Sequence, residues 1–214
     1  MIKKNTIVVL IIIAVSFLIS IYFYPLFPDR IASHWGIDGN VNGYMNKFWG
    51  LFLMPIISIA MFLLFTILPK IDPLKENIKK FEKYFDNFIL LIFLFLFYIH
   101  VLTVFWNLGS RFNMGQFMAP ALGVLFFYSG VLIENAKKNY FIGIRTPWTL
   151  ASENVWNKTH KLGGKLFKIS GIICLFGLVI PDIAFYLVII PVMFSVVYSF
   201  VYSYIEFKKE IKSK

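Results

Sequence analysis

Six long runs of apolar residues alternate with shorter polar segments along this 214-residue chain. The runs cover residues 6–24, 48–68, 88–106, 116–133, 166–180 and 183–204. About 20 apolar residues in a helix, at 1.5 Å per residue, cross a hydrocarbon layer of about 30 Å. The pattern therefore predicts an all-α fold, a polytopic membrane bundle of six transmembrane helices.

The fifth run is the shortest, because only 12 residues separate Lys168 from Pro181. If it crosses, Lys165 and Lys168 must extend their amines back to the interface. We expect it to cross, since otherwise the lysine-rich tail after residue 204 would lie outside the cell. A tight turn at Pro181 and Asp182 then joins the last two spans.

Basic residues fix the expected orientation. Eighteen of the 21 Lys and Arg residues lie before the first run, in the second and fourth gaps and after the last run. The other three are Arg30, Lys47 and Arg111. The positive-inside rule then places both termini in the cytoplasm of a multi-pass cell-membrane protein. The net charge of +10 favours anionic membrane lipid as the counter-charge, rather than direct contact with nucleic acid.

Composition narrows the class further. With 59% hydrophobic residues and a mean hydropathy of +0.75, the chain has too little polar surface for a water-soluble globule. The single cysteine, Cys174, excludes an intrachain disulfide and a Cys-rich metal site.

We divide the chain into three units: residues 1–68, with two spans and an ordered outer loop at 25–47; residues 69–86; and residues 87–214, with four spans and a cytoplasmic motif loop at 134–165. The middle unit is expected to be an amphipathic interfacial helix that Asp72 caps and Pro73 begins. Its apolar residues are Leu74, Ile78, Phe81 and Phe85. A linker lying on the inner leaflet is favoured over a partner-binding helix.

Within the spans the one ionisable residue far from a helix end is His100. Proton relays and intramembrane enzymes usually need several such groups, so a hydrogen bond to a neighbouring helix is the favoured role of His100. No P-loop, zinc-protease or serine-nucleophile motif occurs. We therefore expect no enzyme activity and no cofactor.

The outer loop is rich in turn signals, with Gly36, Gly39 and Gly43 among Asn and Asp residues. His34 has Asp29 and Asp38 nearby, but their spacing matches no strong metal-binding pattern, so no metal site is expected. We expect His34 and Trp35 to hold this loop against the outer helix ends.

The inner loop predicts a helix that begins after Ser152, places Glu153, Trp156 and His160 on one face, and ends at Gly163–Gly164. Two interpretations remain open. Trp148 and Trp156 suit a belt at headgroup level. Alternatively, Arg145, Glu153 and His160 form a polar cluster that binds a ligand or a protein.

Both loops carry motifs that resemble those of the SdpI family of membrane proteins. The outer motif consists of Pro28, Ile31, His34, Trp35, Gly39, Gly43, Tyr44 and Lys47. The inner motif begins with Asn139, Ile142, Gly143, Ile144, Arg145, Thr146, Pro147, Trp148 and Thr149, and continues through Glu153, Trp156 and His160 to Gly163–Gly164. The inner motif is long and specific, and with the six spans the resemblance covers nearly the whole chain.

The resemblance implies an immunity protein that binds a secreted, membrane-active peptide toxin and, as in the family's type member, also captures a transcriptional repressor in signal transduction. The toxin-binding residues it suggests in the outer loop are Arg30, His34, Trp35, Gly39 and Lys47. The cytoplasmic motif residues are Asn139, Gly143, Arg145, Thr146, Pro147, Trp148, Glu153, Trp156 and His160. The alternative is a small membrane transporter or transport-associated protein; a membrane enzyme using His34, Arg145 or His160 is less favoured.

Overall fold

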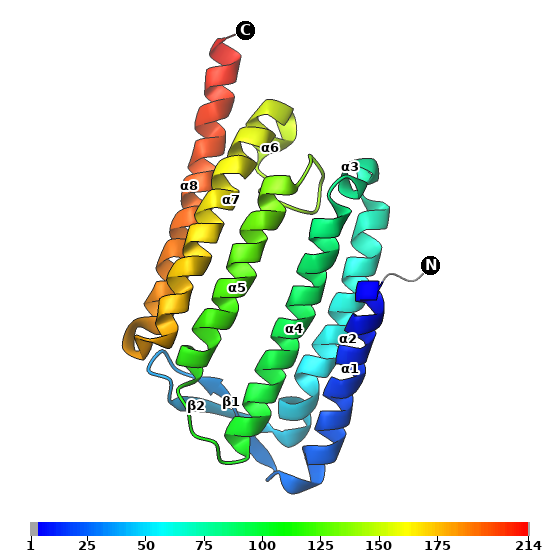
Figure 1. Cartoon of the computed structure of the whole chain (residues 1–214), viewed down its shortest axis with the longest axis vertical. Coiled ribbons are helices and arrows are strands. Elements are labelled where there is room, and N and C mark those ends of the chain that lie inside the picture. Colours follow the sequence, from blue (N-terminus) through cyan, green and yellow to red (C-terminus); the bar gives the residue numbers. More distant parts are fainter. Residues whose placement is uncertain (1–3, 214) are drawn as a thin grey trace.

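The structure, a computed structural model, describes residues 4–213 and consists mainly of long helices lying side by side (Figure 1). In that part of the chain, six helices have 20 residues or more: α1 (Lys4–Phe23), α2 (Lys47–Ile71), α4 (Glu82–Asn107), α5 (Met114–Asn135), α7 (Glu153–Leu175) and α8 (Ala184–Lys212). The short helices are η1 (Tyr24–Leu26), α3 (Lys75–Lys79), α6 (Pro147–Ala151), η2 (Phe176–Leu178) and η3 (Pro181–Ile183). Strands β1 (Arg30–Trp35) and β2 (Val41–Asn46) form one antiparallel hairpin.

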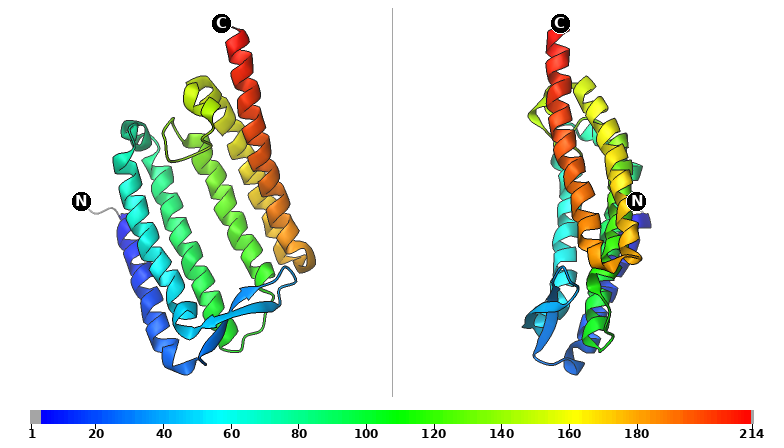
Figure 2. Two further views of the ribbon diagram at one scale, coloured as in Figure 1. Left: turned by 180° about the vertical axis from the view of Figure 1, so that it is seen from behind. Right: turned by 90° about the vertical axis from the view of Figure 1, so that its left-hand side faces the viewer.

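The long helices form two groups of three. Helices α1, α2 and α4 contact one another, as do α5, α7 and α8, and the groups meet where α4 contacts α5. Together they make a thin, broad array, seen edge-on in Figure 2. Helices α3 and α6 and the C-terminal end of α8 lie at one end of the array; the hairpin and the turn between α7 and α8 lie at the other (Figure 1).

The distribution of side chains on α8 is that of a helix in lipid. Its exposed residues include Ile190 (62%) and Phe194 (57%), whereas Ser195, Ser199 and Ser203 are buried against the bundle. A water-soluble helix has the opposite arrangement, while small polar residues facing inward are common at helix interfaces in membranes.

Five helical segments among residues 4–213 have the length and composition of membrane spans: Lys4–Leu26, Lys47–Ile71, Glu82–Asn107, Met114–Asn135 and Pro181–Lys212. The predicted all-helical membrane bundle is confirmed at this level. Helix α7 carries four lysines and is not among the five, although it lies between α5 and α8. Its crossing of the membrane, and the cytoplasmic placement of both termini, stay predictions.

Helix α7 corrects one expectation from the sequence. The inner-loop helix does not end at Gly163–Gly164 but continues through both glycines to Leu175, in one helix with the fifth apolar run. The glycines serve close packing instead, since a Cβ atom at Gly163 would collide with Ile144, and one at Gly164 would lie 2.7 Å from the carbonyl oxygen of Gly130.

Further along the same interface, Gly171 of α7 lies against Gly123 of α5. The glycines recur seven residues apart on each helix, at 123 and 130 and at 164 and 171, so both pairs fall on one face and bring the two backbones into contact. This interface holds the second group of helices together.

The predicted interfacial helix at 69–86 also differs. Helix α2 extends to Ile71, α3 covers only Lys75–Lys79, and α4 begins at Glu82. Asp72 does stabilise the start of α3, accepting a hydrogen bond from the backbone N–H of Leu74 at 2.6 Å, but Pro73 is not helical. The apolar face is buried in protein rather than lipid: Ile78, Phe81 and Phe85 pack with Leu132, Ala136, Ile142 and Trp156. The three-unit division of the chain stays a prediction.

Candidate functional site

The outer loop forms a β-hairpin, where the sequence predicted only successive turns. Arg30 pairs with Asn46 and Ala32 with Tyr44, with irregular register on either side of His34. Gly39 in the connecting turn has a φ of +78°, a conformation that favours glycine, and lies against Asn113 of the α4–α5 connection. Neither 30–35 nor 41–46 alternates regularly between polar and apolar residues, so periodicity gave no signal for these strands.

Asn107 at the end of α4 attaches the hairpin to the bundle. Its side-chain amide accepts a hydrogen bond from the N–H of Ala32 at 2.8 Å and donates one to the C=O of Ala32 at 3.0 Å. The Asn107 amide thus makes the two hydrogen bonds that a neighbouring strand would make with Ala32 of β1. The indole of Trp35 packs edge-on against Trp106, with ring centroids 5.6 Å apart, and Arg111 lies 3.9 Å over the Trp106 ring. Sequence reasoning missed Trp106, Asn107 and Arg111.

The predicted outer-loop residues therefore separate by role. Arg30 and His34 are exposed on β1, where Arg30 donates to the carbonyl of Tyr44 and His34 bonds to Asn42. Trp35 holds the hairpin in place, as expected, whereas no hydrogen bond or ring contact among residues 4–213 joins His34 to a helix end. Lys47 pairs with Asp29 at 3.3 Å and lies over the ring of Tyr24.

At the opposite end, Asn139 shapes the motif loop. The residue is fully buried; its side-chain oxygen accepts from the N–H of Phe141 and of Ile142, and its nitrogen donates to the carbonyls of Lys137 and Ile142. This segment has no helix or strand to pair its backbone N–H and C=O groups. The Asn139 side chain bonds to four of these groups instead and so holds the segment in one conformation.

His160 forms the platform under this loop. Its Nδ1–H donates to the carbonyl of Trp156 at 2.8 Å, so Nε2 carries the lone pair that accepts from the N–H of Ile144 at 3.0 Å. The Trp156 ring stacks on the imidazole at 3.8 Å, and its Nε1–H donates to the carbonyl of Ala136. Burial lowers the pKa of His160 to about 4, partly opposed by the bond to Trp156, and keeps the ring neutral. Gly143, with a φ of +113°, lies against Nε2.

The next residues start a short helix and fasten it to α8. Thr146 and Thr149 form a reciprocal capping box, with Pro147 in the first turn of α6. The Thr146 hydroxyl bonds to Ser203 of α8 at 3.0 Å. Trp148 packs against the rings of Phe200 and Tyr204 at 5.2 and 5.0 Å. The placement of Trp148 at headgroup level stays a prediction.

The predicted cluster of Arg145, Glu153 and His160 is not assembled. His160 is buried beneath the loop, whereas Arg145 and Glu153 are exposed. One guanidinium N–H of Arg145 donates to the carbonyl of Tyr140 at 2.7 Å, and in the described part of the chain no hydrogen bond or ion pair joins these three side chains. His160 therefore holds the loop, whereas Arg145 and Glu153 lie on the exposed surface.

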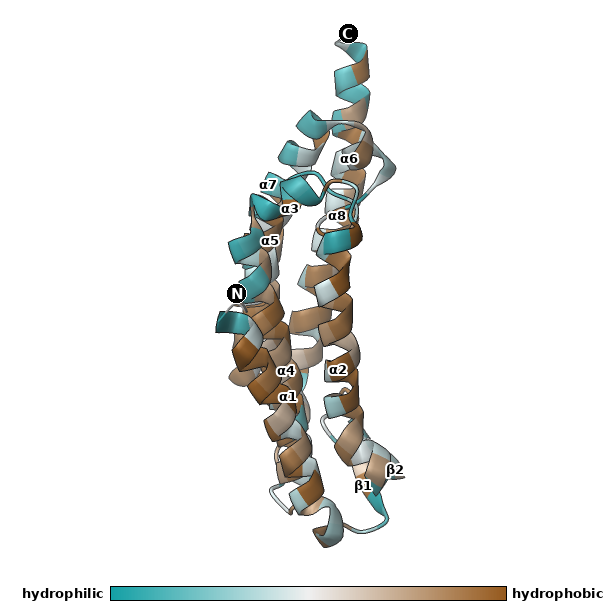
Figure 3. Ribbon diagram, turned by 90° about the vertical axis from the view of Figure 1, so that its right-hand side faces the viewer, coloured by the Kyte–Doolittle hydropathy of each residue, from teal (hydrophilic) through white to brown (hydrophobic). Residues whose placement is uncertain are grey.

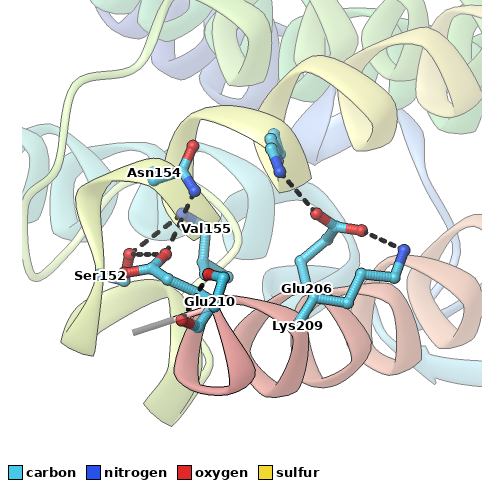
Figure 4. Close-up of polar contacts among 8 residues, drawn as sticks. Ser152, Asn154, Val155, Glu206, Lys209 and Glu210 are labelled. Atoms are coloured by element: carbon cyan, nitrogen blue, oxygen red, sulfur yellow. Dashed lines mark hydrogen bonds and ion pairs between the residues drawn. The ribbon is translucent and has the colours of Figure 1, made fainter.

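Charged residues join the start of α7 to the end of α8 (Figure 4). Glu206 is buried and binds Lys158 and Lys209, each at 2.8 Å, while Glu210 accepts from Ser152 at 2.7 Å and from Asn154 at 3.2 Å. Sequence reasoning missed this network, because its partners lie about 50 residues apart. It sets the end of α8 beside the motif loop.

The motif loop also contacts the first half of the chain. Asp72, already bonded to Leu74, accepts from the N–H of Tyr140 at 2.9 Å, and Asn77 of α3 donates to the carbonyl of Lys138 at 2.9 Å. With the apolar cluster around Trp156, these bonds join the two groups of helices at this end of the bundle.

Within the spans, His100 is buried among α1, α2 and α4. Its Nε2 lies 3.3 Å from the hydroxyl of Ser20, which also donates to the carbonyl of Leu51 at 2.7 Å. This is the interhelical contact that the sequence favoured. Among residues 4–213 no group of three His, Cys, Asp or Glu side chains is placed to hold a metal ion.

Comparison with known proteins shows that two family profiles match this chain, one over the hairpin and one over the motif loop. The profile described as the SdpI/YfhL protein family matches residues 135–203, which include the motif loop, α6 and α7, and one described as a domain of unknown function (DUF1648) matches residues 11–59, which include the hairpin. The protein named "Immunity protein SdpI" from Bacillus subtilis (strain 168) is 28% identical over 172 residues, covering 80% of this chain and 79% of its own. No solved structure matches. Residues 135–203 therefore match the SdpI/YfhL family, and the similarity to a protein of that name extends over most of both chains.

Proposed function

We propose that this protein is a membrane immunity protein that binds a secreted, membrane-active peptide toxin and so protects the cell. The observation that carries the proposal is its similarity, over 80% of the chain, to a protein named for immunity. The two family profiles fall on residues 11–59 and 135–203, which contain the hairpin and the motif loop. The cell membrane is the proposed location.

The hairpin is the proposed toxin-binding surface. On the positive-inside orientation it lies outside the cell, where a secreted peptide arrives. Arg30 and His34 are exposed on β1, and Ile37 (59%) and Tyr44 (55%) expose apolar and aromatic area beside them. Exposed aromatic and arginine side chains on a rigid support are typical of protein-binding surfaces. Asn107 and Trp106 supply the rigid support.

Binding without catalysis or transport is the favoured mechanism. A transporter of the proton-coupled kind needs ionisable groups near the middle of several spans, and in the five described spans His100 is the ionisable side chain far from a helix end. Both nitrogens of His160 are also engaged, since Nε2 accepts from the N–H of Ile144 in the loop and Nδ1–H donates to the carbonyl of Trp156 in α7.

We also propose that the motif loop binds a cytoplasmic partner, such as a transcriptional repressor. The support is the exposure of Arg145 and Glu153, and the Arg145 guanidinium uses only one of its N–H groups on the loop, at the carbonyl of Tyr140. A guanidinium with unused N–H groups binds carboxylates in a planar, two-bonded geometry.

Capture of the toxin peptide by the purified protein tests the hairpin proposal. The double variant Arg30→Ala, His34→Ala removes one cation and one exposed ring without touching Asn107 or Trp35. We expect it to bind the peptide at least tenfold more weakly, the effect of losing about 1.4 kcal/mol of contact energy. Asp182→Asn, an exposed charge change at the same end of the bundle, is the matched control and should bind normally. Equal binding by the double variant and the wild type would reject the hairpin as the site.

A further inference from the structure

A cavity of about 790 Å³ lies where α1, α2, α3 and α4 meet. In the described residues α1 begins at Lys4, part-way along the bundle, and α2 extends beyond that level to Ile71 (Figure 1). The floor is apolar and comes from all four helices: Val9, Phe62, Phe65, Ile78, Phe85 and Ile89. Its volume is within the range of about 300–1,000 Å³ that holds small-molecule ligands.

The rim of this cavity carries three lysines and three acidic residues, and two of the lysines lie outside its ion pairs. Lys70, Lys75 and Lys79 line it, and Lys79 is paired with Glu76 at 2.8 Å. Lys70 and Lys75 are exposed and have no ion pair with any residue from 4 to 213. Glu82 and Asp86, which also line the rim, are each engaged in interactions of their own. Two lysine amines are therefore available to a ligand.

The depth of the cavity matches the boundary between lipid tails and headgroups. Figure 3 shows the apolar spans giving way to hydrophilic residues toward α3, and a hydrophilic first turn of α1 part-way along the bundle. The floor lies among span residues, and the lysines lie at the ends of α2 and α3. A ligand here contacts apolar side chains at one end and ammonium groups at the other.

We propose that this cavity binds one phospholipid with an anionic headgroup. An acyl chain lies on the aromatic floor, and the phosphate accepts hydrogen bonds from the amines of Lys70 and Lys75. The lipid, rather than a free phosphate, is the occupant because most of the lining is apolar and lies within the membrane. The lipid contacts Ile78 and Phe85, which pack against the motif loop, so it stabilises the joint between the two groups of helices. This site does not depend on the immunity function.

Native mass spectrometry of the full chain in detergent, with added lipids, tests the proposal. We expect one phosphatidylglycerol per chain, tighter than phosphatidylcholine, and no displacement by inorganic phosphate. The double variant Lys70→Gln, Lys75→Gln should bind phosphatidylglycerol about thirty-fold more weakly, as expected for loss of two lysine contacts near a membrane surface. Thr66→Trp, which fills the cavity and keeps both lysines, should reduce binding of both lipids.

The matched control is Lys208→Gln, Lys212→Gln, which removes the same charge from the end of α8. Its affinity for phosphatidylglycerol should equal that of the wild type. Equal losses in the two double variants would show a non-specific charge effect and overturn the site, as would displacement by phosphate alone. Binding only after residues 1–3 are deleted would show that the chain's own terminus is the occupant, and would also overturn it.

Discussion

Gly143 offers a quantitative test of how the motif loop is held. Its φ of +113° is strained for any residue with a side chain, and a Cβ atom there would collide with Nε2 of His160. Gly143→Ala therefore adds backbone strain of roughly 1–3 kcal/mol and also displaces the imidazole from the N–H of Ile144. Leaving that donor unpaired costs a further 1–3 kcal/mol, in order of magnitude.

Gly109 provides the matched control. Its φ is +109°, almost the same as that of Gly143, but a Cβ atom there would meet nothing within 4 Å. Gly109→Ala therefore measures the backbone strain alone, and the difference between the two variants measures the contact with His160.

The assay is thermal unfolding of each purified variant in the same detergent. For a protein of this length, 1 kcal/mol shifts the Tm by about 2–4 °C, so the Tm of Gly143→Ala should lie roughly 2–12 °C below that of Gly109→Ala. Equal Tm values in the two variants would refute the argument that His160 holds the loop through Ile144.

Two further predictions concern topology and the inner surface. Reporter fusions should signal the outside after Gly43, Asn113 and Asp182, and the cytoplasm after Lys80, Trp156 and Lys212; a cytoplasmic signal at Asp182 would contradict the six-span arrangement. Arg145→Lys keeps the charge but removes the planar guanidinium, so capture of a cytoplasmic partner in a pull-down should fall several-fold at equal membrane abundance, whereas Lys137→Arg should leave it unchanged. Normal capture by Arg145→Lys would favour the interpretation of the loop as a membrane anchor.

Much of the helical architecture was predictable because long apolar runs and their flanking charges are local signals. The glycine contacts between α5 and α7 were missed, although the spacing of seven at Gly123 and Gly130 was visible. Glycine was taken as a helix end at Gly163–Gly164, yet in a membrane bundle it often permits close backbone approach, and α7 continues.

The sites were less predictable, because roles depend on partners far apart in the sequence. Helical spacing grouped His160 with Arg145 and Glu153. In the structure, Nε2 of His160 instead accepts a hydrogen bond from the backbone N–H of Ile144, and the imidazole is buried under the loop. The hairpin depends on Asn107, 75 residues from Ala32, and no pattern around either residue predicts their contact. Similarly, the apolar face of 74–85 gave no sign that Trp156, rather than lipid, covers it.

A killing assay tests most directly whether this protein protects the cell from a secreted peptide toxin. The wild-type protein would be expressed alone in a bacterium susceptible to a secreted peptide of the sporulation-delaying type, with its insertion into the membrane verified. Cells with the wild-type protein should survive at toxin levels that kill cells with an empty vector. Cells with the Arg30→Ala, His34→Ala variant should lose that survival, and cells with Asp182→Asn should keep it. Undiminished killing of cells that contain the inserted wild-type protein, repeated with a toxin encoded beside its own gene if one exists, would contradict the immunity function and favour the transport alternative.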